Sequence, residues 1–237
     1  MHSSVLPGME SADSVRPVVA AFDVDKTLTL RDCVVPFLRR VSSWRIGPRL
    51  MVAIIPLGWA CLRRDRDRLK ALATQVVMTG LTRQELESQA EIFSQVIIDK
   101  WLRPDAVQRL QWHRQQGHLV VLVSASYASY LRPLGSYLGC AGVLACEVAF
   151  DELDHCTGQL VDGNCRGSEK ERRLKSWMLE QGLAAVDTYA YGDSAGDAHL
   201  LAMATWPTKV GKKSISPIPS VGLAAHTDVA MSHKGPL

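Results

Sequence analysis

Two aspartates spaced two residues apart are the residues of this chain best suited to chemistry. Asp23 and Asp25 stand in the run FDVDKTLT, at the end of an apolar, β-rich run at residues 18–24. Side chains two apart point the same way from an extended chain, and two like charges side by side are unfavourable unless a cation or different protonation states relieve the repulsion. One carboxylate can attack phosphorus while the other, protonated, gives its proton to the leaving oxygen. A lone D-x-D is also common in turns and helix caps, so the pair alone does not decide the chemistry.

Ser124 and Lys170 are two further candidates, and both suit a bound phosphate. Ser124 lies in the apolar run at residues 119–126. Its hydroxyl and the backbone N–H groups after it can hold phosphate oxygens, although an ordinary strand-end serine is the simpler explanation. Lys170 follows Ser168, the expected N-cap of a helix whose capping box Glu171 completes. A lysine in a first turn opposes the positive end of the helix unless an anion binds there.

A fourth group of candidates is the run GDSAGD, which contains Asp193 and Asp197 and follows an expected strand at residues 188–191. Two acids four apart among glycines suit Mg²⁺, a hard cation that takes oxygen ligands. A glycine-rich turn with a helix cap explains the run equally well.

Strand and helix patterns alternate around these residues. A parallel sheet covered by helices on both faces is therefore the expected α/β fold, and the carboxyl ends of its strands should bring the candidates together. Further expected strands lie at residues 142–150, 157–161 (part of a hairpin) and 208–210. The expected helices begin at Thr82, with Glu85 closing a capping box, after Pro104 and at Ser168, and also span residues 127–138 and 195–204.

The pattern divides the chain into four parts. Residues 1–16 are expected to be a disordered leader, residues 17–32 and 100–210 the catalytic core, residues 33–99 an inserted helical cap, and residues 211–237 a disordered tail.

The order D-x-D-x-T, Ser, Lys, G-D-S-x-G-D resembles the haloacid dehalogenase-like (HAD) hydrolase superfamily. It is most similar to subfamily IB, the phosphoserine-phosphatase-like branch, from about Val18 to Val210, and the run GNCRGSEKERRL resembles a hallmark of that subgroup. The resemblance implies a Rossmann-like core with an inserted α-helical cap of the C1 type. It also implies a Mg²⁺-dependent phosphatase that forms an aspartyl-phosphate.

By that resemblance each candidate has a role. Asp23 would be the nucleophile and Asp25 the general acid and base, with the main-chain carbonyl of Asp25 on the metal. Ser124, Lys170 and Thr27 would bind the phosphoryl group or fix its loop. The Mg²⁺ site would comprise Asp23, Asp25, Asp193 and Asp197. Lys26 departs from the small residue that many relatives have, and a P-type ATPase, which can carry this lysine, needs transmembrane helices that the chain lacks.

The substrate is left open by two observations on the cap. Asp32 matches the acidic residue with which phosphoserine phosphatases recognise the substrate amine, but the stretch that matches their substrate-binding arginine, ALATQVVMTGLT, has Thr74 near that position and no arginine. Arg68 could reach in from another register. The expected substrate is therefore a small, phosphoserine-like phosphorylated metabolite.

A lipid phosphate such as phosphatidylglycerophosphate is the alternative substrate. The apolar run at residues 50–62 lies within a stretch, residues 39–70, that carries nine Arg or Lys against two Asp, which leaves peripheral membrane contact through the cap open. Packing between cap helices and a solvated basic face explain the same features. A phosphotransferase or a non-catalytic regulatory protein with this fold are further alternatives.

Composition and charge argue against nucleic-acid-binding, secreted and membrane-spanning proteins. The net charge of +3 in 237 residues does not indicate nucleic-acid binding, and no secretory signal or bilayer-length apolar run is present. Six cysteines without a C-x-x-C pair favour reduced thiols and a cytoplasmic protein. The oligomeric state is not indicated.

Overall fold

Six strands form one sheet in the computed structural model, which describes residues 16–42, 63, 65–183, 186–211 and 213–215. The strand order is β4-β3-β2-β1-β5-β6, and every neighbouring pair is parallel except β3 and β4. The strands are β1 (Val18–Phe22), β2 (Leu119–Tyr127), β3 (Gly142–Phe150), β4 (Cys156–Val161), β5 (Asp187–Gly192) and β6 (Trp206–Lys209). The predicted α/β fold and the hairpin of its fourth strand are confirmed.

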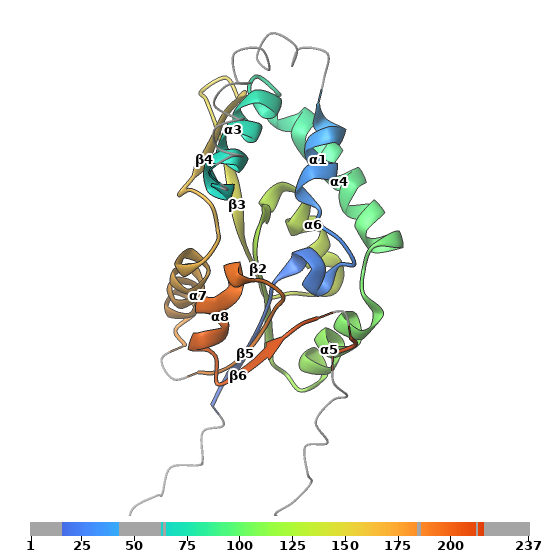
Figure 1. The fold of residues 1–237 in the computed structure, drawn as a ribbon, viewed down its shortest axis with the longest axis vertical. Coiled ribbons are helices and arrows are strands. Elements are labelled where there is room, and N and C mark those ends of the chain that lie inside the picture. Colours follow the sequence, from blue (N-terminus) through green and yellow to red (C-terminus); the bar gives the residue numbers. More distant parts are fainter. Residues whose placement is uncertain (1–15, 43–62, 64, 184–185, 212, 216–237) are drawn as a thin grey trace, which may run out of the picture.

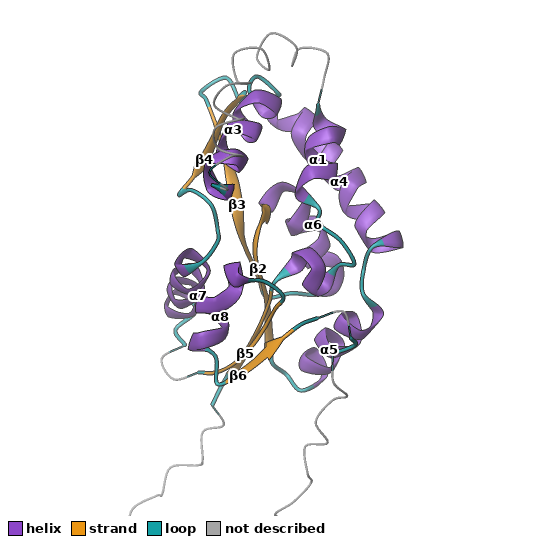
Figure 2. Cartoon of the chain, viewed as in Figure 1, coloured by secondary structure: helices purple, strands orange, loops and turns teal. Residues whose placement is uncertain are grey.

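Helices cover both faces of this sheet (Figures 1 and 2). Helices α5 and α6 lie on one face, and α7 and α8 lie on the other. The helices are α1 (Val34–Val41), α3 (Arg66–Met78), α4 (Arg83–Lys100), α5 (Pro104–Gln115), α6 (Ala128–Leu138), α7 (Ser168–Glu180) and α8 (Ala198–Met203). Because helices bury both faces, the central strand β1 is uniformly apolar and its residues 19–22 are fully buried.

Local signals fix where several helices begin. Thr82 and Glu85 form the predicted capping box of α4, and Pro104 is the first residue of α5. The capping box expected at Ser168 is wrong. Ser168 is already helical, and the N-cap is Gly167, whose φ of 62° suits glycine and whose position leaves α7 without a side-chain cap.

The helix expected at residues 195–204 is divided into two parts. A single 3-10 turn, η2 (Ala195–Asp197), precedes α8, because the side chains of Ser194 and Asp197 cap each other's backbone and tighten the first turn. The last strand, expected at residues 208–210, begins and ends slightly earlier, at Trp206 and Lys209.

Helices α1, α3 and the beginning of α4 lie beyond the carboxyl ends of the central strands, beside the far end of the β3–β4 hairpin (Figure 1). Helix α3 packs on β4, whereas α4 packs on α6 of the core. The boundaries expected for a cap stay a prediction. The apolar run at residues 50–62, nearly all of the leader and most of the tail lie outside the described residues.

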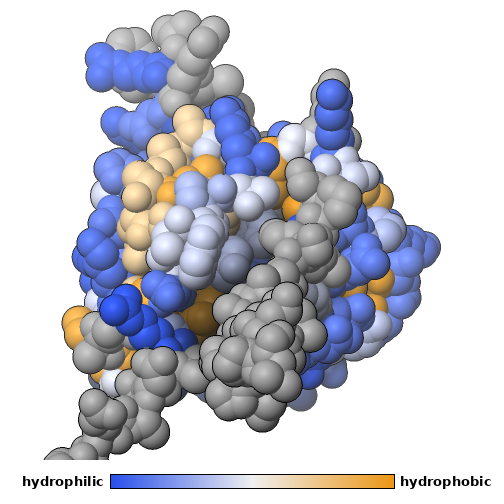
Figure 3. Space-filling model, turned by 90° about the horizontal axis from the view of Figure 1, so that it is seen from below, coloured by the Kyte–Doolittle hydropathy of each residue, from blue (hydrophilic) through white to orange (hydrophobic). Residues whose placement is uncertain are grey.

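The surface seen from below in Figure 3 is mostly hydrophilic, with small separate hydrophobic areas. Within the described part of the chain, no helix combines the length and the apolar character needed to cross a bilayer.

Candidate active site

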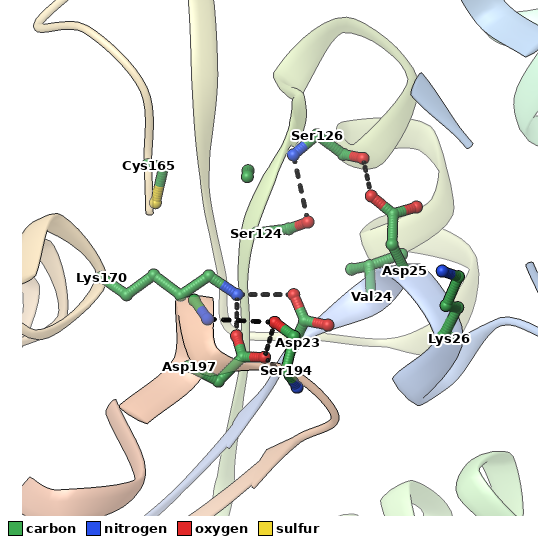
Figure 4. A network of polar contacts seen from close by, with 12 residues as sticks. Asp23, Val24, Asp25, Lys26, Ser124, Ser126, Cys165, Lys170, Ser194 and Asp197 are labelled. Carbon is green, nitrogen blue, oxygen red and sulfur yellow. Dashed lines mark hydrogen bonds and ion pairs between the residues drawn. The ribbon is translucent and has the colours of Figure 1, made fainter. Parts of the chain in front are cut away.

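The candidate residues meet at the carboxyl ends of the central strands (Figure 4). Asp23 follows β1, Asp193 follows β5, and Ser124 lies in β2 between them and the hairpin. Lys170 reaches the same place from the first turn of α7. Ligands bind outside this edge of a parallel sheet, so the topology explains why residues far apart in sequence converge.

Lys170 is the centre of the site. Its Nζ donates to Asp23 Oδ1 and to Asp197 Oδ1, both at 2.5 Å, and the residue is only 2% exposed. Burial disfavours its charge, but the two carboxylates outweigh burial and raise the pKa of Lys170. The same contacts keep the pKa of Asp197 below its usual value although burial opposes this.

The pKa of Asp23 is set by a different balance of burial and charge. Burial is the largest influence and raises the pKa of Asp23 to about 7, with Asp197 and Asp25 adding to the rise and Lys170 opposing it. Its Oδ2 accepts no hydrogen bond from any described residue, while its Oδ1 is held by Lys170. Oδ1 of Asp23 is therefore held by Lys170, Oδ2 makes no hydrogen bond within the described chain, and Asp23 lines the cavity.

Asp23, Asp193 and Asp197 form a set of carboxylates that can hold a metal ion. One oxygen from each lies within 4.8 Å of the others. Burial, and then the charge of Asp197, raises the pKa of Asp193, which shows that negative charge gathers here. Three carboxylates, two of which contact Lys170, are a donor set that fits Mg²⁺.

Asp25 does not point the same way as Asp23, contrary to the expectation from an extended chain. After Asp23 the chain enters a tight turn, η1 (Val24–Leu28). The Asp25 carboxylate accepts hydrogen bonds from the Cys33 N–H at 2.8 Å and the Ser126 Oγ at 2.6 Å (Figure 4). Burial, and then Asp32, raises the pKa of Asp25, and these two donors oppose the rise. Its carboxylate lies outside the carboxylate set above, and the expected metal contact through its carbonyl stays a prediction.

Hydrogen bonds hold the turn after Asp23 in one conformation. Lys26 has a φ of 61°, and the Thr29 N–H donates to the Val24 carbonyl at 2.9 Å to close the turn. Arg103, which is buried, donates to the carbonyl of Lys26 at 3.3 Å from outside the turn. Thr27 Oγ1 is buried and has no hydrogen-bond partner among the described residues.

A cavity of about 120 Å³ opens over these groups. Its lining comprises Asp23, Asp25, Lys26, Asp32, Arg66, Ala125, Arg166, Lys170, Asp193, Ser194, Gly196 and Asp197. Ser124 and Thr27 are fully buried and do not line it; Ser124 Oγ accepts the Ser126 N–H at 3.1 Å. Their expected contacts with phosphate stay predictions.

Among the lining residues, Asp32 was expected from the sequence, whereas Arg66 and Arg166 were not. Asp32, expected near the substrate, does line the cavity, but its Oδ1 also accepts the N–H groups of Val34 and Val35 at the start of α1. Arg66 and Arg166 were not singled out. Arg66 stood among many basic residues, and Arg166 stood inside the run GNCRGSEKERRL, which was the only signal for it.

The family model described as haloacid dehalogenase-like hydrolase matches residues 20–202, most of the chain and all four motifs. The chain belongs to this family. The family predicted from the motifs is thus confirmed.

Two relatives are similar to most of the chain. Protein CicA of Caulobacter vibrioides is 33% identical over 192 residues, which cover 79% of this chain and 83% of CicA. The "Inhibition of morphological differentiation protein" of Streptomyces azureus is 25% identical over 203 residues, 83% of this chain and 72% of that protein.

Solved structures show the same fold. A protein of unknown function from Bordetella pertussis Tohama I has a TM-score of 0.68 at 22% identity, covering 82% of this chain and 90% of that one. A phosphoserine phosphatase solved as a phospho-aspartyl intermediate analogue has a TM-score of 0.56 at 15% identity, covering 82% and 87%.

Proposed function

We propose that this protein is a Mg²⁺-dependent phosphomonoester hydrolase that forms an aspartyl-phosphate on Asp23. The observation that carries the proposal is the buried Lys170, held at 2.5 Å from both Asp23 and Asp197 beside the carboxylate set of Asp23, Asp193 and Asp197. Burying so much charge is unfavourable, and such arrangements occur where a reaction needs them.

The free oxygen of Asp23 supports its role as nucleophile. In the first step Oδ2 would attack phosphorus, the bond from phosphorus to the ester oxygen would break, and the leaving oxygen would take a proton from Asp25. The raised pKa of Asp25 supports a protonated carboxyl that can act as this acid. In the second step water would attack the phosphoaspartate, give a proton to Asp25 and release phosphate from Asp23.

The positive charge for this reaction comes from two sources in the proposal. Lys170 lies on Oδ1 of Asp23 and would reduce repulsion between that carboxylate and an approaching phosphate. Mg²⁺ held by Asp23, Asp193 and Asp197 would supply further positive charge against the phosphoryl oxygens.

The substrate class is proposed from the cavity. A cavity of about 120 Å³ lined mostly by charged residues suits the phosphate end of a small polar metabolite. The lipid-phosphate alternative depends on the apolar run at residues 50–62, which lies outside the described residues, and on the basic stretch at residues 39–70 around it. The size and charge of the cavity favour the small metabolite. A hydrolase and a phosphotransferase differ in the acceptor that reaches the phosphoaspartate, and both share this first step.

The test is an assay with Mg²⁺ against phosphoserine, other small phosphate esters, lysophosphatidate and phosphatidylglycerophosphate. Asp23→Asn should lower kcat by about 10³-fold or more, because the amide is a poor nucleophile. Acid-quenched enzyme should carry ³²P from labelled substrate, released by hydroxylamine as expected of an acyl phosphate.

A matched control is Asp187→Asn. Asp187 is the first residue of β5 and pairs with Val18, the first residue of β1, whereas Asp23 follows the last residue of β1. The Asp187 side chain contacts no charged partner within the described chain. The activity of the Asp187→Asn variant should equal that of the unmodified protein. Phosphate release that survives Asp23→Asn, or that needs no divalent cation, would overturn the mechanism.

A further inference from the structure

Two arginines, Arg66 and Arg166, line the same cavity as the candidate active-site residues. Arg66 is the first residue of α3, and Arg166 lies in the loop before α7. Neither guanidinium makes an ion pair or a hydrogen bond within the part of the chain that the structure describes. Five aspartates line the same cavity, but none of them pairs with either arginine, so both guanidinium groups can donate to an anion from outside the chain.

The other cations of the lining already face carboxylates. Lys170 is shared between Asp23 and Asp197. Lys26 lies close enough to Asp193 to oppose the rise in pKa that burial and Asp197 cause there. A phosphomonoester bound at Asp23 would use these groups and the metal, and would leave both arginines without an anion.

Arg166 is seated against the floor of the site. A Cβ atom at Gly196 would lie 3.1 Å from Nε of Arg166 and 3.3 Å from its Cγ, so the arginine lies across a surface that only glycine leaves flat. The Gly167 N–H donates to the carbonyl of Gly196 at 2.9 Å and ties the two loops together.

Arg66 is held in place by the residues that follow it. Asp67 accepts a hydrogen bond from Asn164 Nδ2 at 2.6 Å, and Lys70 donates to the carbonyl of Ala125 and to Asn164 Oδ1. The start of α3 is thereby fixed to the loop that carries Arg166. Arg66 also stands at the positive end of its helix, where a bound anion would remove an unfavourable interaction.

We propose that Arg66 and Arg166 bind a second anionic group of the substrate, a carboxylate or a phosphate, while its phosphomonoester lies at Asp23. The planar guanidinium fork matches either group with paired hydrogen bonds. The small cavity indicates that a short linker joins the two anionic groups. This inference rests on the proposed function and narrows its substrate to doubly anionic small molecules.

The test uses three substrates of one chain length: 3-hydroxypropyl phosphate, 3-phosphooxypropanoate and propane-1,3-diyl bisphosphate. The measured quantity is the ratio of kcat/KM for each charged-tail substrate to that for the hydroxyl-tail substrate. Arg66→Gln and Arg166→Gln should each lower this ratio by about 10-fold or more, the effect of losing a hydrogen bond between charged groups. The larger ratio tells a carboxylate from a phosphate.

The matched control is Arg68→Gln, which removes the same charge from the first turn of α3. Arg68 lines a different cavity, between α3 and β4. Its ratio should equal that of the unmodified protein. If Arg66→Gln and Arg166→Gln lower kcat/KM equally for all three substrates, or not at all, the second-anion site is wrong.

A binding measurement separates this inference from the proposed function. Calorimetry with Mg²⁺ would compare 4-phosphonobutanoate with butylphosphonate, neither of which can be hydrolysed. The former keeps the spacing between the two anionic groups of 3-phosphooxypropanoate. Tighter binding of the former that depends on both arginines supports the site even if no substrate is hydrolysed, an outcome that would overturn only the hydrolase. Equal binding of both compounds would overturn the second-anion site whatever the enzyme hydrolyses.

Discussion

Two lysines, Lys170 and Lys70, are both buried, but different kinds of partner contact their charged ammonium groups. Lys170 is 2% exposed and contacts two carboxylates, Asp23 and Asp197. Lys70 is 9% exposed and has neutral partners: the carbonyl of Ala125, Asn164 Oδ1 at 3.1 Å, and the ring of Tyr127, whose centroid lies 4.6 Å from Nζ. No carboxylate pairs with Lys70 within the described residues.

The partners of the two lysines indicate different roles. Two carboxylates around one ammonium concentrate charge, which is useful where a phosphoryl group and a metal ion must bind. A carbonyl, an amide and an aromatic face only satisfy an ammonium, and they fasten α3 to the end of β2 and to the loop before α7. The proposed reaction therefore uses Lys170, whereas Lys70 holds the helix that carries Arg66 in place.

The largest effect is expected for Lys170→Met. Removing this lysine leaves Asp23 and Asp197 buried without a counter-charge, which should lower the free energy of unfolding by about 3–5 kcal/mol in EDTA. Because Mg²⁺ can replace part of the missing charge, urea unfolding with and without Mg²⁺ should show a larger stabilisation by the ion than in the unmodified protein. Phosphatase activity should fall by about 10²-fold or more.

The exposed Lys175, which pairs with Glu171 on the same helix, gives the control. Lys175→Met should leave the urea midpoint, its Mg²⁺ response and the activity unchanged. A Lys170→Met protein that is as stable as the unmodified one in EDTA would contradict the role of Lys170 as the counter-charge of two carboxylates.

A smaller effect is expected for Lys70→Met. The methionine fills the same space, but the carbonyl of Ala125 and Asn164 Oδ1 lose their ammonium donor and keep only the weaker thiol donor Cys146 Sγ. Unfolding should therefore become easier by about 1–3 kcal/mol. No buried carboxylate is left behind, so Mg²⁺ should not restore this loss. Urea unfolding in EDTA and in Mg²⁺ measures both quantities.

The kinetics of the Lys70→Met variant should also differ from those of Lys170→Met. Lys70→Met should raise KM more than it lowers kcat, because α3 would hold Arg66 less firmly over the cavity while Asp23 and Lys170 keep their contacts. If Lys70→Met instead lowers kcat as far as Lys170→Met does, Lys70 takes part in the chemistry and the division between the two lysines is wrong.

The sequence predicted the region of Lys170 better than that of Lys70, for physical reasons. Lys170, Asp23 and Asp193 stand at element ends, and a parallel sheet brings the carboxyl ends of its strands together whatever the loops do. The alternation of strands and helices and the capping box of Thr82 likewise follow from local patterns. The roles expected for Ser124 and Thr27 stay predictions.

Lys70 and the turn of Asp25 could not be predicted in this way. Lys70 was one of nine basic residues at 39–70 whose pattern favours a solvated face, and its main partner is a carbonyl, which has no side-chain signature. The direction of Asp25 depends on a tight turn and on donors from Cys33 and Ser126, of which one lies far along the chain. Contacts of this kind appear only when the chain has folded.

The smallest effect is expected from exchanging Asn164 with its partner Asp67, whose Oδ1 accepts the Asn164 amide at 2.6 Å. Asn164→Asp alone sets two carboxylates against each other, and Asp67→Asn alone loses a charged acceptor, so each should cost about 1 kcal/mol. The double variant restores the hydrogen bond with its direction reversed. Urea unfolding of the four proteins should therefore give a coupling energy of about 1 kcal/mol, and additive losses would contradict the contact.

The exchange also gives Lys70 the kind of partner that Lys170 has. In the double variant a carboxylate at position 164 would face Nζ of Lys70, where an amide oxygen now lies at 3.1 Å. Lys70→Met should then destabilise the double variant more than it destabilises the unmodified protein, because it would leave a carboxylate instead of a neutral amide. Equal losses in the two backgrounds would mean that partner chemistry does not set the difference between the two lysines.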